Sequence, residues 1–137
     1  MMTAKIKWLE SQKIVGESGT GHSVVMDTND SNKGVSPMEM LLLGVGGCTS
    51  IDVLSILKKS KQDIIDFEIR VEAEREEKHP RVFQEVNIHY IIKGRKISES
   101  HVKRAIELST EKYCGASITL GRSGTKMKYT HQIENLE

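Results

Sequence analysis

Residues 36–60 read SPMEMLLLGVGGCTSIDVLSILKKS and form the longest apolar stretch of the chain. Ser36, Pro37 and Glu39 predict a helix start at its beginning. The serine hydroxyl can accept the amide of the third helical residue, and the glutamate can reach back to the amide of Ser36. Apolar residues then recur on nearly all sides, so we expect a central helix that is covered on most of its surface.

Two acidic residues argue against a membrane span. Glu39 and Asp52 interrupt the apolar run, and the uncharged stretch between them is shorter than the ~20 residues that a bilayer requires. The N-terminal sequence MMTAKIKWLE lacks the apolar core of a signal peptide. The sequence therefore predicts a cytoplasmic protein without a membrane partner.

Composition argues against nucleic acid as a partner. Twenty basic and 19 acidic residues leave a formal charge of +1, so no global field attracts a polyanion. Aromatic residues make up 4% of the chain, too few for platforms on which bases stack. The five histidines show no metal-ligand spacing. We accordingly expect no nucleic acid, no metal and no cofactor.

Hydrophobic periodicity assigns the remaining elements. Strands are predicted at 5–9, 14–17 and 22–27 before the long helix, at 64–76 and 82–93 after it, and at 126–134 near the end. A second helix is predicted at 99–113 and one further helical turn at 116–120. This order predicts one α+β domain over residues 1–137, with antiparallel sheets around the long central helix.

The chain contains two cysteines, Cys48 inside the long helix and Cys114 after the second helix. Taken by itself, either cysteine suits a small buried side chain as well as a reactive thiol. Cys114 directly precedes the short helical turn, a position that favours a thiolate. The glycines at 44, 46 and 47 lack the GK[ST] ending of a phosphate-binding loop. They are expected to allow close packing of the helix against a second copy of itself.

Several motifs together resemble one family. A proline near the start of an apolar helix, a cysteine about ten residues later and a second cysteine after a downstream helix resemble the OsmC/Ohr family. The segments SPMEM, GGC, IDV, SIL and EKYC are most similar to its YhfA-like branch. The resemblance implies an intertwined homodimer with two active sites that reduce organic hydroperoxides. It further implies that Cys48 is the peroxidatic thiolate, that Cys114 resolves its sulfenic acid to a disulfide, and that a dithiol reductant restores both thiols.

The chain departs from the peroxidases of that family at several positions. Met38 stands where they carry a glutamate, and the neighbouring Glu39 lies about 180° around the helix from Cys48. Those peroxidases also carry an arginine in their N-terminal strands, whereas no arginine precedes Arg70 in this chain. Asp52 lies on the same side of the helix as Cys48, where its charge would raise the pKa of the thiol.

These departures leave alternatives open. One is a ligand-binding or redox-sensing relative without efficient peroxidase activity. Such a relative would have an apolar pocket at the dimer interface and a Cys48 thiol with a pKa near or above its free value. Another is a structural dimer with inert cysteines.

Overall fold

The computed structural model describes residues 1–136, and the chain divides into two compact units with the boundary between Leu41 and Leu42. In the first unit, β1 (Ala4–Glu10), β2 (Lys13–Ser18) and β3 (Ser23–Met26) form an antiparallel sheet in the order β1-β2-β3. The predicted meander is therefore confirmed. The assignment of all 137 residues to one domain stays a prediction.

The predicted helix start is confirmed at the atomic level. Helix α1 spans Pro37–Lys59. The amide of Ser36 donates to Glu39 Oε1 at 2.9 Å, and the amide of Glu39 donates to Ser36 Oγ at 3.2 Å. These hydrogen bonds from Ser36 lower the pKa of Glu39. Glu39 therefore has the role of a cap, and α1 runs without interruption through its glycines.

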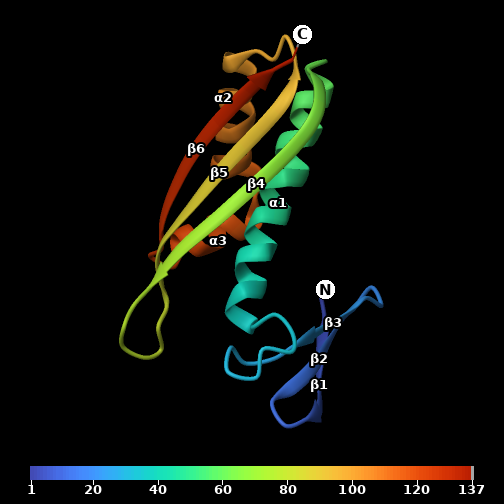
Figure 1. The fold of residues 1–137 in the computed structure, drawn as a ribbon, viewed down its shortest axis with the longest axis vertical. Coiled ribbons are helices and arrows are strands. Elements are labelled where there is room, and N and C mark those ends of the chain that lie inside the picture. The colour runs from blue at the N-terminus through green and yellow to red at the C-terminus, as the bar shows by residue number, and fades with distance from the viewer. Residues whose placement is uncertain (137) are drawn as a thin grey trace. The chain divides into compact units, whose positions relative to one another are not determined.

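The second unit contains a three-stranded sheet, visible in Figure 1 as three long strands side by side. The strands β4 (Asp63–Arg75) and β5 (Phe83–Arg95) form the expected antiparallel hairpin. The expectation of purely antiparallel sheets is wrong for β6 (Lys126–Asn135), which pairs in parallel with β5. The helical segments between β5 and β6 return the chain to the starting end of the sheet, and such a crossover makes parallel pairing possible.

The two faces of this sheet differ as the alternation predicted. One face is apolar and carries Phe67, Ile69, Val71, Val86, Ile88, Tyr90, Ile92, Met127 and Ile133. The opposite face of β4 carries the exposed side chains Glu68, Arg70, Glu72 and Glu74. The apolar face forms the core together with buried residues of α1 and α2, among them Val53, Leu57 and Val102.

The second predicted helix is divided in the structure. Helix α2 spans Glu99–Leu108, and a single π-helical turn η1 covers Ser109–Tyr113. Helix α3 (Gly115–Arg122) confirms the further helical turn that was predicted at 116–120. The amide of Cys114 donates to the carbonyl of Ser109 at 2.6 Å, which closes a turn one residue wider than that of an α-helix. Single π-turns of this kind occur frequently at functional sites.

Helix α1 is covered on one side only within the chain. Val53 and Leu57 are fully buried, whereas Leu43 is 59% and Ile51 72% exposed. By length and composition α1 could cross a membrane, but core helices pass the same test. We expected its glycines to pack against a second copy, and for Gly46 that is wrong. A Cβ atom there would lie 3.2 Å from Val71 Cγ2, because this glycine allows close packing against β4 of the same chain.

Candidate functional site

The structure brings the two predicted site cysteines together. Cys48 lies in the middle of α1, and Cys114 is the residue that caps the N-terminus of α3. The sulfur atoms of both, and a carboxylate oxygen of Asp52, all lie within 4.8 Å of one another. Both thiols are free, Cys114 is fully buried and Cys48 is partly exposed. This cluster of two sulfurs and one carboxylate is the candidate site.

Helix geometry explains the position of Asp52. Residues four apart on a helix lie one above the other on the same face, so Asp52 follows Cys48 by one turn. The prediction that both side chains lie on the same side of α1 is confirmed by the distances above. Asp52 makes no ion pair with any residue in the described range 1–136. Within that range the Asp52 carboxylate therefore has a hydrogen bond from Ser109 but no cationic partner.

The environment of Cys114 keeps its thiol protonated. Burial raises the pKa of Cys114, and the neighbouring sulfur of Cys48 raises it further. The Ser117 amide donates to the Cys114 sulfur at 3.4 Å, and the Ser117 hydroxyl lies 3.0 Å from it. These contacts lower the pKa by less than burial raises it. The sequence placed Cys114 correctly at a helix start, where the Ser117 amide lowers the pKa as expected, but burial outweighs this effect.

A chain of buried hydroxyls ends at Asp52. The Tyr90 and Thr49 hydroxyl oxygens are 2.8 Å apart, Thr49 and Ser109 are also 2.8 Å apart, and Ser109 donates to Asp52 Oδ2 at 3.0 Å. Each hydroxyl has one proton to donate. Because the proton of Ser109 is directed at the carboxylate, Thr49 must donate to Ser109, and Tyr90 must donate to Thr49. All three O–H groups therefore donate in the direction of Asp52.

The sequence analysis did not assign these hydroxyls to the site. Thr49, Tyr90 and Ser109 are each fully buried in the structure. Tyr90 lies in the strand predicted at 82–93 and Ser109 in the helix predicted at 99–113, and a buried hydroxyl requires a hydrogen-bond partner. A hydroxyl at a position that periodicity assigns to the core was therefore the one sequence feature that could indicate a buried hydrogen bond. The sequence did not indicate which residue would be the hydrogen-bond partner.

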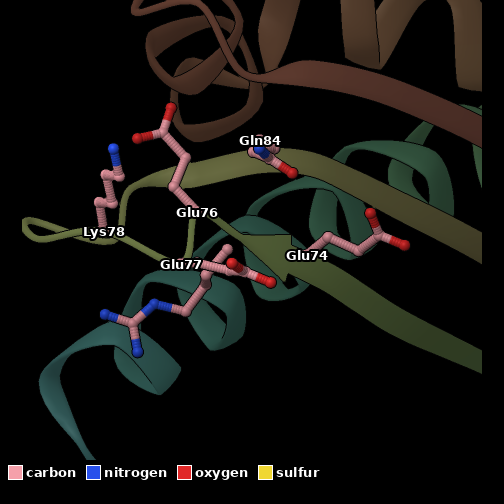
Figure 2. Close-up of a pocket in the computed structure, with 6 residues that line it drawn as sticks. Glu74, Glu76, Glu77, Lys78 and Gln84 are labelled. Carbon is pink, nitrogen blue, oxygen red and sulfur yellow. The ribbon is translucent and has the colours of Figure 1, made fainter.

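A separate hollow lies at the end of the β4–β5 hairpin (Figure 2). It has a volume of about 640 Å³ and is lined by Glu74, Arg75, Glu76, Glu77, Lys78 and Gln84. The carboxylates of Glu74 and Glu76 point in different directions in Figure 2 and do not converge on a common point. The hollow contains neither cysteine, so the candidate site remains the cluster around Cys48.

An α+β chain with one cysteine on a core helix, and a second brought beside it from a helix start, belongs to the class of dithiol proteins. A family model described as "OsmC-like protein" matches residues 29–130. The chain is also 44% identical over 133 residues to Protein YhfA of Escherichia coli K12, with 97% of each chain covered. The chain therefore belongs to the OsmC-like family, as its motifs predicted.

Solved structures agree with the fold. The OsmC-like protein of Mycoplasma pneumoniae superposes with a TM-score of 0.85 at 20% identity, covering 98% of this chain and 97% of that one. An organic hydroperoxide resistance protein OsmC from Legionella pneumophila superposes with a TM-score of 0.70 at 14% identity, covering 96% of each chain. These likenesses establish an OsmC/Ohr fold for this chain.

Proposed function

We propose that this chain is a thiol-based redox protein that reduces organic hydroperoxides through Cys48 and Cys114. The observation that carries the proposal is the approach of the two sulfurs to within 4.8 Å. Membership of the OsmC-like family supports it, as does the fold shared with a protein that is named for organic hydroperoxide resistance.

The proposed reaction assigns different tasks to the two thiols. Cys48 is the more exposed of the pair, so its thiolate attacks the O–O bond, releases the alcohol and becomes a sulfenic acid. The sulfur of Cys114 then attacks the sulfenic sulfur, water leaves and a disulfide forms. An S–S bond is about 2.05 Å long, so side-chain rotation must bring the sulfurs closer than they lie here. A dithiol reductant, most available in a reducing compartment such as the cytoplasm, restores both thiols by exchange.

A second candidate is a redox-sensing or ligand-binding protein without efficient peroxidase activity. Burial of Cys114 favours it, because burial raises the pKa of this thiol and a protonated thiol is a weak nucleophile. This candidate predicts the same disulfide, formed slowly at neutral pH.

The test is to add cumene hydroperoxide to the reduced protein and to follow both thiols by mass spectrometry. The peroxidase proposal expects rapid loss of two hydrogens from the wild type as the disulfide forms. The variant Cys114→Ser should accumulate sulfenic acid on Cys48, and Cys48→Ser should not react. Slow oxidation to the same disulfide selects the sensing candidate. If neither cysteine is oxidised, both candidates fail.

We further propose that the chain functions as a homodimer. Large apolar side chains are exposed on α1 and in the first unit, namely Ile6, Trp8, Leu9, Leu41, Leu43 and Ile51. Large apolar side chains that are exposed in one copy of a chain can be buried when two copies associate. Light scattering coupled to size-exclusion chromatography should give twice the mass of the chain. Ile51→Asp should give the monomer mass, and a monomeric wild type would contradict the proposal.

A further inference from the structure

We propose that Cys48, Asp52 and Cys114 form a binding site for a thiophilic divalent cation, best matched by Zn²⁺. Two sulfurs and one carboxylate oxygen lie within 4.8 Å of one another. In a tetrahedral zinc site with bonds of about 2.0–2.3 Å, neighbouring ligand atoms are about 3.5–3.8 Å apart. Contraction by at most about 1 Å would bring the three atoms to that spacing, a shift that small side-chain rotations can supply.

Two of the three proposed ligands, Asp52 and Cys114, already accept hydrogen bonds from neighbouring serine residues. The Ser109 hydroxyl donates to Oδ2 of Asp52 at 3.0 Å, and it is itself the end of the buried hydroxyl chain. The amide of Ser117 donates to the sulfur of Cys114. Such outer contacts orient the ligands of metal sites and are frequently as important as the ligands themselves. Oδ1 of Asp52 accepts no hydrogen bond from the described residues 1–136 and is therefore available to a metal ion.

The ligand set selects the kind of cation. Thiolates are soft ligands that favour zinc, whereas magnesium and calcium require several oxygen ligands. The hairpin hollow in Figure 2 shows the contrast, because its carboxylates diverge and no sulfur is present. Three protein ligands leave a fourth tetrahedral position for water or a substrate atom, as in catalytic zinc sites. The partial exposure of Cys48 provides the route by which the ion enters.

Binding is coupled to proton release. The cation takes up two thiolates and one carboxylate, so two thiol protons leave to solvent for each ion bound. Because those protons must leave before the ion binds, the affinity should rise with pH. The metal and the proposed disulfide require the same two sulfurs, so occupancy by one excludes the other. The inference does not depend on peroxidase activity, since it concerns the reduced protein alone.

The experiment is a titration of the reduced full-length protein with Co²⁺ in the absence of oxygen. The site should give a thiolate-to-cobalt charge-transfer band in the near ultraviolet and visible bands typical of tetrahedral cobalt. The signal should saturate at one ion per chain, and Zn²⁺ should remove it by displacement. Binding of Zn²⁺ should also protect both cysteines from iodoacetamide until a chelator is added.

Variants separate this site from adventitious binding. Asp52→Asn should weaken the affinity at least tenfold, and Ser109→Ala by about 10–100-fold. The matched control is Asp66→Asn, an exposed aspartate on β4 that should leave the affinity unchanged. Equal affinities of the Asp52 and Asp66 variants would overturn the proposed ligand set.

A measurement on the wild type makes the result independent of whether a variant folds. X-ray absorption of the zinc-loaded protein should show two sulfur neighbours at about 2.3 Å. Fewer than two sulfur neighbours, or no charge-transfer band in protein whose thiols are shown to be reduced, would overturn the proposal. Failure of the peroxide test would leave these readouts unaffected, so the two proposals can fail separately.

Discussion

The buried hydroxyl chain predicts that substitutions at Thr49 and Tyr90 are not additive. Thr49→Val keeps the shape of the side chain but removes the hydroxyl that receives the proton of Tyr90. The phenol is fully buried, so its O–H group is then left without a partner. Tyr90→Phe instead removes the outer end of the chain and leaves Thr49 donating to Ser109.

The magnitudes follow from which groups lose their partners. An unsatisfied buried donor lowers the free energy of unfolding by about 1–3 kcal/mol. An ordinary hydrogen bond raises it by a net amount of about 0.5–1.5 kcal/mol. We therefore expect Thr49→Val to lower the free energy of unfolding by about 3 kcal/mol and Tyr90→Phe to lower it by about 1 kcal/mol. The double variant contains no stranded phenol, so its loss should be about 2 kcal/mol, less than that of Thr49→Val alone.

Urea unfolding of the wild type, both single variants and the double variant measures this coupling. Midpoints should shift while the dependence on urea concentration stays constant, which shows that stability alone has changed. Additive losses in the double variant would refute the inferred order of donors and acceptors. A Tyr90→Phe loss equal to that of Thr49→Val would refute it as well.

Three further predictions concern the cap, the packing and the thiols. The hydrogen bonds that lower the pKa of Glu39 should make the wild type more stable than Glu39→Gln above pH 4.5, with the difference in Tm lost as pH falls below that value. Gly46→Leu should destabilise by about 1–3 kcal/mol because its side chain meets β4, whereas Gly121→Ala, whose Cβ has ordinary contacts, should stabilise by up to about 1 kcal/mol in urea unfolding. Iodoacetamide should modify Cys48 before Cys114, as followed by mass spectrometry. The rate of modification at Cys114 should rise as pH increases beyond 9.0, because burial raises the pKa of this thiol. Preferential modification of Cys114 at neutral pH would contradict the last prediction.

Features set by neighbouring residues were the ones that sequence reasoning could predict. The capping box at Ser36 and Glu39 depends on residues three apart, and both of its hydrogen bonds are present. The position of Asp52 beside Cys48 follows from helical geometry in the same way. The motifs around both cysteines were specific enough to indicate the family, which the family match at residues 29–130 confirms.

The sequence by itself determined the order of elements, the start of α1, the family and the helix face that carries Cys48. Only the tertiary structure decided that β6 runs parallel to β5 and that Cys114 comes to Cys48 with its thiol held neutral. It also decided that Tyr90 and Ser109 are joined through Thr49. The physical reason is the separation along the sequence between the groups that interact. Caps and helix faces depend on residues a few positions apart, whereas strand direction, burial and the pKa of a buried thiol depend on groups that only folding brings together.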